Sequence, residues 1–270
     1  MRHCFWFAGG AILLAMIALR PLMMATALAA TLPTMLSATG CARDAMLVFD
    51  GSASMDELSF DVSRKTRIVD ARTALRDALP DITPFRRVGL LTYGPGASAD
   101  SCANIDLRFG PRADAAAAIV DQIDTLQPKG LTALAASVRA AADALDHRNR
   151  SGIVVLVTDG NETCGGRPCA LGTALAQEAT DLTVHVIGFQ VVVDFFSWDN
   201  PEQVDVGAGN TVAKCLADRT GGLYVSTDTV DELADALRAT LGCALIGAAS
   251  PAPIPPVSAF ETSAVPRRQT

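Results

Sequence analysis

The fold of this chain is decided by residues 45–54, which read AMLVFDGSAS. Residues 45–50 form a short, mostly apolar run, and the Gly and Ser residues that follow it favour a turn. A continuous apolar run of this length is typical of a strand that is buried on both faces of a sheet. The sequence therefore predicts a buried strand that ends in a polar loop.

Outward from this strand, apolar runs alternate with segments of helical periodicity. The pattern predicts strands at 45–50, 87–93, 104–109, 152–158, 182–189 and 223–226, and helices at 61–79, 114–126, 132–145, 169–179, 211–220 and 230–241. We expect Pro80 and Pro84 to end the first helix, and 104–109 to return as a hairpin strand. The alternation predicts an α/β fold, a doubly wound, mostly parallel six-stranded sheet with one antiparallel edge strand and helices on both faces.

Composition excludes two classes of protein. The chain has 270 residues, with 22 Lys and Arg against 29 Asp and Glu, so its formal net charge is −7. A nucleic-acid binder normally carries a basic face, so we expect no nucleic-acid partner. Apolar residues make up 50% of the chain, which is too many for a disordered protein, and the length is sufficient for a buried core.

Both ends of the chain differ from the folded part, which we expect at 44–243. Residues 1–40 are typical of an export segment, with apolar runs on either side of Arg20. Cleavage after Ala29 and cleavage before Cys41 both remain open, and residues 38–41 weakly resemble a lipid-attachment motif. The Pro-rich residues 244–270 are expected to form a disordered tail. We therefore expect an exported protein, periplasmic or extracellular, with no membrane span after cleavage and either unmodified or lipid-anchored at Cys41.

Polar side chains gather in three of the predicted loops. Asp50, Ser52 and Ser54 follow the first strand, Thr132 precedes a helix, and Asp159 closes the strand at 152–158. In a doubly wound sheet, ligands bind beyond the carboxyl ends of the strands, so we expect these loops to meet. Carboxylate and hydroxyl oxygens in this pattern suit a hard divalent cation. Taken alone, the first loop is equally compatible with a helix N-cap and a turn.

Together, the DxSxS pattern at 50–54, Thr132 and the Asp-Gly pair at 159–160 resemble the metal-ion-dependent adhesion site of the von Willebrand factor type A family. The segments around Cys102, Cys164, Cys169 and Cys215 resemble a bacterial exported branch of that family. The resemblance covers 44–243 and departs mildly at Ala53, where many members have Gly. It implies direct metal coordination by Ser52 and Ser54, with Thr132 binding directly or through water. Asp50 and Asp159 would act mostly through bridging waters. The implied cation is Mg²⁺, with Mn²⁺ or Ca²⁺ as alternatives.

The resemblance implies a function in binding. An open coordination position on the cation would capture an Asp or Glu carboxylate of a partner protein, as in adhesion. We expect no enzymatic activity, because the chain lacks a GxSxG elbow and has no phosphate-binding Gly-rich motif after a strand. The alternatives are a structural type A domain with a non-functional metal site and, less favoured, a hydrolase.

The cysteines also indicate export. Once Cys4 is removed with the export segment, six remain, and an even number in an exported chain is typical of disulfides. The sequence alone does not choose a pairing. The resemblance implies Cys41–Cys243, because type A domains bring their ends together. For the other four it leaves open two arrangements, namely Cys102–Cys164 with Cys169–Cys215, or a local Cys164–Cys169 loop.

Several residues outside the five-residue set have structural interpretations. Residues 190–210 fit no regular element, and we expect an inserted loop near the same sheet edge that serves either specificity or capping. Asn161 and Glu162 are expected to cap loops rather than bind metal. We expect His185 to be a packed or surface residue of its strand, and His147 to lie at a solvated helix end.

Overall fold

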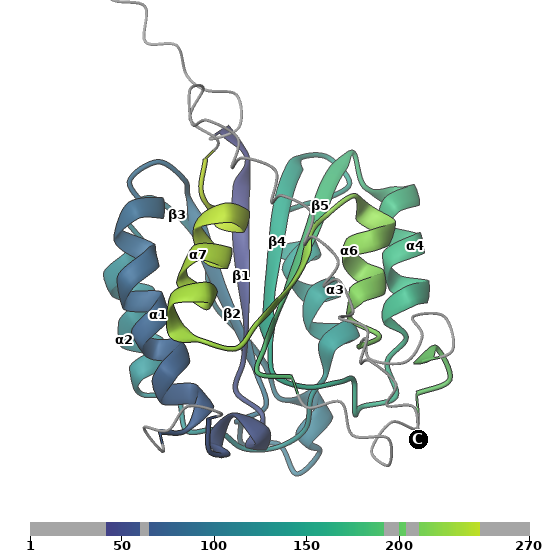
Figure 1. Ribbon diagram of the computed structural model, residues 1–270. Coiled ribbons are helices and arrows are strands. Elements are labelled where there is room, and N and C mark those ends of the chain that lie inside the picture. The colour runs from purple at the N-terminus through teal and green to yellow at the C-terminus, as the bar shows by residue number, and fades with distance from the viewer. Residues whose placement is uncertain (1–41, 60–64, 192–199, 204–210, 244–270) are drawn as a thin grey trace, which may run out of the picture. The chain divides into compact units, whose positions relative to one another are not determined.

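The computed structural model describes residues 42–59, 65–191, 200–203 and 211–243 (Figure 1). The strands are β1 (Asp44–Asp50), β2 (Val88–Tyr93), β3 (Ile105–Arg112), β4 (Ser151–Thr158), β5 (Asp181–Phe189) and β6 (Tyr224–Thr227). The helices are α1 (Arg67–Ile82), α2 (Ala116–Asp124), α3 (Leu134–Ala144), α4 (Pro168–Glu178), α6 (Lys214–Thr220) and α7 (Val230–Leu241), with short 3-10 turns η2 (Ala53–Asp56) and η3 (Ser101–Ala103). In this part of the chain, no helix is long and apolar enough to cross a bilayer.

The strands form one six-stranded sheet in the order β3-β2-β1-β4-β5-β6. All neighbours run parallel except β3, which pairs with β2 in the antiparallel sense at one edge. This confirms the predicted fold class. The chain proceeds outward from β1 on one side and from β4 on the other, so the strand order reverses between these two strands. Their carboxyl ends are therefore the expected place for a ligand.

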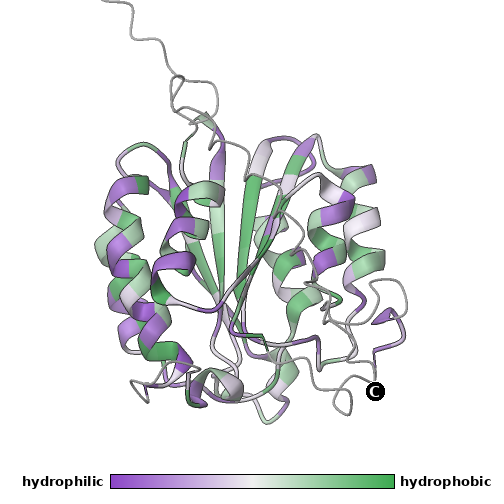
Figure 2. Cartoon of the chain, viewed as in Figure 1, coloured by the Kyte–Doolittle hydropathy of each residue, from purple (hydrophilic) through white to green (hydrophobic). Residues whose placement is uncertain are grey.

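Helices cover both faces of the sheet, as Figure 1 shows. Alternate residues of β1 point to opposite faces: Leu47 and Phe49 join a core with α1, α2 and α7, whereas Met46 and Val48 join a core with α3, α4 and α6. All seven residues of β1 are buried, which explains the unbroken apolar run. In Figure 2 the strands are correspondingly apolar, and the polar residues lie on the helices and loops.

The first helix differs from its predicted range of 61–79 at both ends. Residues 65 and 66 are not helical, because Thr66 pairs with Leu58 in an isolated β-bridge before α1 begins at Arg67. Pro80 does not end the helix, which continues to Ile82. Proline removes a single hydrogen bond in this last turn, while Leu79 and Ile82 on either side remain buried in the core. Burial therefore outweighs the missing bond.

Three predictions concern residues outside the described part of the chain. They are the export segment at 1–40, the lipid attachment or disulfide at Cys41, and the disordered tail at 244–270. The predicted Cys41–Cys243 bond stays a prediction for the same reason.

Candidate metal centre

Asp50 fixes the first loop of the centre. It ends β1 and is fully buried. One carboxylate oxygen accepts the backbone N–H of Ser52 at 2.7 Å, and the other accepts the hydroxyl of Thr158 at 2.7 Å. Asp50 therefore both folds its own loop and joins the ends of β1 and β4, which are neighbours in the sheet.

The two serines of the motif and Asp159 meet at this point. The hydroxyl oxygens of Ser52 and Ser54 lie 3.0 Å apart, and the Ser54 hydroxyl donates to Asp159 Oδ1 at 2.7 Å. Asp159 follows directly after β4, and its side chain is fully buried. The structure thus brings together four of the five predicted residues through side-chain hydrogen bonds.

Thr132 belongs to a loop that is hydrogen-bonded to the first one. The backbone N–H of Lys129 donates to Gly51 O at 2.8 Å, and that of Ala53 donates to Gly130 O at 3.2 Å. Thr163 holds Thr132 itself, because its hydroxyl accepts the Thr132 N–H at 2.8 Å and its own N–H donates to Thr132 O at 3.0 Å. These contacts place the loop of Thr132 next to the loop of Ser52 and Ser54. None of them involves the hydroxyl of Thr132.

The spacing of the serine hydroxyls fits an octahedral cation. Two ligands at right angles around Mg²⁺, each about 2.1 Å from the ion, lie about 3.0 Å apart. Ser52 Oγ and Ser54 Oγ are separated by that distance. Because the hydrogen of the Ser54 hydroxyl goes to Asp159, the hydroxyl of Ser52 is the donor, and Ser54 Oγ the acceptor, in the 3.0 Å hydrogen bond between the two serines. Among the described residues, no group of three His, Cys, Asp or Glu side chains could hold a metal ion.

Burial and the charge of Asp50 make it unfavourable for Asp159 to be ionised. Burial, followed by the negative charge of Asp50, raises the pKa of Asp159 to about 7, although the hydrogen bond from Ser54 and the charge of Arg67 act in the opposite direction. Burial, followed by the charge of Asp50, also raises the pKa of the Tyr93 hydroxyl well above its usual range. A bound cation would offset the cost of keeping Asp159 ionised, because it would stabilise the carboxylates of Asp159 and Asp50.

Arg67 is a residue of this centre that sequence reasoning missed. It is the first residue of α1 and is 4% exposed. Its Nη1 donates to Asp159 Oδ2 at 2.9 Å and to the backbone oxygen of Ser54 at 3.1 Å. A cation in the first turn of a helix opposes the helix dipole, so an arginine there needs an acidic partner. The sequence could not reveal this conflict, because it predicted a helix from residue 61 and only the structure places the helix start at Arg67.

Neighbouring residues have the structural roles that were expected, with one exception. Glu162 accepts the N–H of Ala135 at the start of α3 at 2.9 Å, and Asn161 accepts the N–H of Val212 at 3.2 Å, which confirms loop capping. His185 is a partly buried strand residue whose Nδ1 accepts the Leu223 N–H. The solvated position predicted for His147 is wrong. Its side chain is 1% exposed because Glu178 of α4 covers it, with 3.2 Å between Nε2 and Oε1.

Two disulfides brace the rim of the centre. The bonds are Cys102–Cys164 and Cys169–Cys215, so the first of the two predicted arrangements is confirmed and the local Cys164–Cys169 loop is wrong. Cys164 follows directly after Thr163, the residue that holds Thr132. The Cys102–Cys164 bond therefore ties the support of the Thr132 loop to the segment that enters β3.

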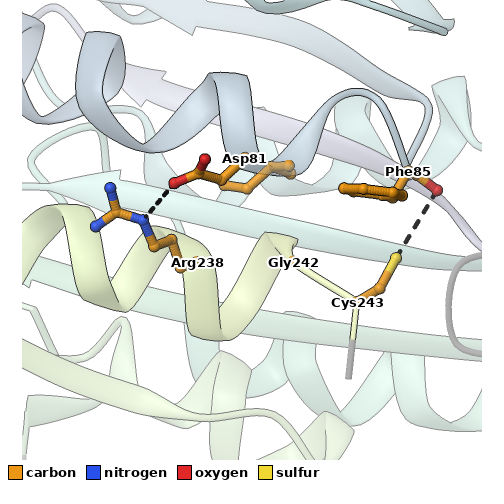
Figure 3. Close-up of a pocket in the computed structure, with 6 residues that line it drawn as sticks. Asp81, Phe85, Arg238, Gly242 and Cys243 are labelled. Atoms are coloured by element: carbon orange, nitrogen blue, oxygen red, sulfur yellow. Dashed lines mark hydrogen bonds and ion pairs between the residues drawn. The ribbon is translucent and has the colours of Figure 1, made fainter. Parts of the chain in front are cut away.

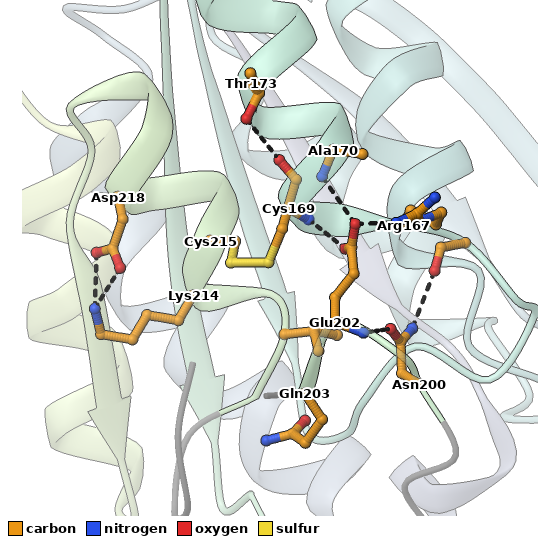
Figure 4. The surroundings of a disulfide bond; sticks show 12 residues. Arg167, Cys169, Ala170, Thr173, Asn200, Glu202, Gln203, Lys214, Cys215 and Asp218 are labelled. Carbon is orange, nitrogen blue, oxygen red and sulfur yellow. Dashed lines mark hydrogen bonds and ion pairs between the residues drawn. A yellow bond between two sulfur atoms is a disulfide. The ribbon is translucent and has the colours of Figure 1, made fainter. Parts of the chain in front are cut away.

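Part of the predicted insert, residues 200–203, lies at this rim. Figure 4 shows the Glu202 carboxylate at the start of α4, where it accepts the N–H of Cys169 at 2.7 Å and of Ala170 at 3.1 Å. Gln203 accepts a hydrogen bond from Asn161, two residues after Asp159, at 3.3 Å. This part of the insert therefore caps a helix, and it also contacts the loop that carries Asp159.

A pocket of about 160 Å³ lies away from the metal centre, near the ends of α1 and α7 (Figure 3). It is lined by Asp81, Ile82, Phe85, Arg238, Gly242 and Cys243. Arg238 Nε donates to Asp81 Oδ2 at 3.0 Å, and the same guanidinium also pairs with Asp77 and Asp235. The pocket shares no residue with the centre described above.

Residues 45–162 match the family model described as von Willebrand factor type A domain. The match supports a type A domain here. The Bacillus subtilis protein YwmD, which is uncharacterised, is 28% identical over 70% of this chain and 81% of its own length. Among solved structures, the pilus adhesin SpaC from Lactobacillus rhamnosus GG is 15% identical, with a TM-score of 0.54 over 74% of this chain and 30% of that one. The SpRpn10 type A domain is 14% identical, with a TM-score of 0.50 over 74% of this chain and 96% of that one. At these identities the two structures show that the fold is shared, and no more.

Proposed function

We propose that this protein is an exported, metal-dependent protein-binding module. A divalent cation, Mg²⁺ first among the candidates, would be held by Ser52, Ser54 and Thr132, with Asp50 and Asp159 acting through water. The observation that carries the proposal is the 3.0 Å separation of the two serine hydroxyls, with Ser54 oriented by its hydrogen bond to Asp159. This is the spacing of adjacent ligands around an octahedral ion.

The residues present would leave the cation able to bind a further anion. Its direct ligands would be neutral hydroxyls, while both carboxylates already accept hydrogen bonds, Asp50 from Ser52 and Thr158 and Asp159 from Ser54. When bound, the cation supplies positive charge and an open coordination position. The oxygen of a partner's Asp or Glu is the hard anionic ligand that suits this position.

Binding is favoured over catalysis. A serine nucleophile needs a neighbouring base. His147 pairs with Glu178, and His185 accepts a bond from Leu223, so both described histidines are engaged away from the serines. Ser54 instead donates to a carboxylate that also pairs with Arg67. We therefore propose a role in binding, without catalytic turnover. The alternative is a structural type A domain whose centre does not bind metal.

Export to an oxidising compartment, periplasmic or extracellular, is part of the proposal. The disulfides Cys102–Cys164 and Cys169–Cys215 support it, because such bonds persist mainly outside the cytosol. The net charge of −7 argues against nucleic acid as a partner. A protein partner that presents an acidic side chain remains the proposed ligand.

Calorimetric titration with Mg²⁺ and Mn²⁺ tests the metal centre. We expect heat of binding with the wild type and at least about tenfold weaker binding with Ser54→Ala, since a tenfold change corresponds to about 1.4 kcal/mol for one lost ligand. Ser151→Ala is the matched control, because Ser151 is an exposed serine at the opposite end of β4, and it should bind like the wild type. Absence of heat with the wild type, or equal affinity with Ser54→Ala, would favour the structural alternative.

A further inference from the structure

Arg67 links the two sides of the metal centre through one nitrogen. Nη1 lies 2.9 Å from Asp159 Oδ2, which follows β4, and 3.1 Å from both Ser54 O and Glu57 Oε2, which belong to the loop after β1. The guanidinium is buried, so these charge-assisted bonds are shielded from solvent. Arg67 therefore fixes Asp159 relative to the serine loop.

Both oxygens of Asp159 are engaged as a result. Oδ1 accepts the Ser54 hydroxyl at 2.7 Å, and Oδ2 accepts Arg67 at 2.9 Å. For Asp159 to coordinate a cation directly, its carboxylate would have to rotate away from one of these donors. The guanidinium bond opposes that rotation, because it is a buried ion pair as well as a hydrogen bond.

The same guanidinium lowers the negative charge of the centre. With Asp159 ionised, Asp50 and Asp159 contribute two buried negative charges, and Arg67 contributes one buried positive charge beside them. Glu57 is 66% exposed, so solvent screens its contribution. A divalent cation would therefore meet less negative charge than the two carboxylates alone provide, and more of its own charge would remain for an incoming anion.

We propose that Arg67 is a positioning residue that keeps Asp159 out of direct metal coordination, and so keeps the cation available to the carboxylate of a partner. This inference rests on the metal-binding function proposed above. It assigns to Arg67 an effect that a purely structural role does not have: loss of the guanidinium strengthens metal binding and weakens the binding of a carboxylate to the loaded site.

A purely structural role of Arg67 and the proposed positioning role predict opposite changes in metal affinity when the guanidinium is removed. If Arg67 served the fold alone, its removal would misplace Asp159 and weaken metal binding. If it acts as we propose, Arg67→Met frees Asp159 Oδ2 and removes a positive charge, and both effects favour the cation. We expect the affinity for Mn²⁺ alone, measured from the electron paramagnetic resonance signal of free Mn²⁺, to rise at least about tenfold.

The matched control is Arg76→Met on the same helix. Arg76 pairs with Asp124 on the surface, with 2.6 Å between the groups, and does not contact the centre. Its replacement should leave Mn²⁺ affinity unchanged. Acetate binding to the Mn²⁺-loaded proteins, followed by water proton relaxation, should weaken in Arg67→Met and be unchanged in Arg76→Met.

The possible outcomes separate the proposed metal-binding function from the proposed role of Arg67. If the wild type binds no Mn²⁺, the proposed function fails and the role of Arg67 fails with it. If the wild type binds Mn²⁺ and Arg67→Met binds no more tightly, the role of Arg67 alone is overturned. Should Arg67→Met be unfolded without metal, its folding is titrated with Mn²⁺ by circular dichroism. Recovery at Mn²⁺ concentrations below those that saturate the wild type supports the proposal, and failure to recover at saturating concentrations overturns it.

Discussion

Replacement of Gly94 by alanine should destabilise the fold and damage the metal centre together. Gly94 follows β2 and has a φ of +103°, a region that residues with a side chain rarely adopt. A Cβ added there would lie 2.6 Å from Gly51 C and 2.7 Å from both Gly51 O and Ser52 N. These are backbone atoms of the loop that carries the proposed metal ligands Ser52 and Ser54, so relief of the clash requires that loop to move.

The expected magnitude follows from these two effects. Backbone strain at such a φ costs about 1–3 kcal/mol, and overpacking against atoms that cannot rotate away costs about 1–3 kcal/mol more. We therefore expect Gly94→Ala to lower the free energy of unfolding by about 2–6 kcal/mol. Because a domain of this kind is stabilised by only about 5–15 kcal/mol, the loss would be easily measured.

Gly221→Ala separates strain from clash. Gly221 ends α6 with a φ of +70°, and an added Cβ would meet no atom within 4 Å. It should therefore cost only about 1–2 kcal/mol, the usual penalty of the left-handed conformation. The assay is urea unfolding followed by circular dichroism with the disulfides intact, together with Mn²⁺ titration. Equal destabilisation by the two variants, or Mn²⁺ binding by Gly94→Ala that matches the wild type, would refute the reasoning.

Two further predictions concern the framework around the centre. Hydrogen bonding by Arg139, and then by Arg148 and His147, lowers the pKa of Glu178 from 4.5 to about 2, so its stabilising effect is present above pH 4.5 and is lost as the pH falls towards 2. Glu178→Gln should therefore unfold at lower urea than the wild type at pH 7, and a difference that does not shrink towards pH 2 would contradict this. The double replacement of Cys102 and Cys164 by alanine opens a loop with a sequence separation of 62 residues and should lower the free energy of unfolding by about 2–5 kcal/mol, measured by urea unfolding; a loss below about 1 kcal/mol would contradict it.

The sequence predicted the fold because its signals are local. The strongest strand signal is a nearly continuous apolar run in β4, where seven of eight residues are buried. Three of the five candidate residues, Asp50, Ser52 and Ser54, also lie within one loop, which is held by a hydrogen bond between residues two positions apart. Such features are read from a few neighbouring residues.

The end of the first helix shows where local signals fail. Pro80 was expected to stop α1, yet the helix continues to Ile82 because its apolar residues pack on the sheet. His147 shows the same limit, since a polar neighbourhood in sequence predicted exposure and a contact with Glu178, 31 residues away, buries it. In both cases a tertiary contact outweighed a local preference.

The sequence by itself determined the α/β fold, the positions of most elements and the five residues Asp50, Ser52, Ser54, Thr132 and Asp159 as a candidate set. The tertiary structure decided which of the open cysteine pairings forms, and it placed Arg67 on Asp159 across 92 residues of chain. The physical reason is that hydrophobic periodicity and turn chemistry act between near neighbours. A disulfide or a buried ion pair instead depends on which distant segments the sheet order makes adjacent, here the ends of β1 and β4.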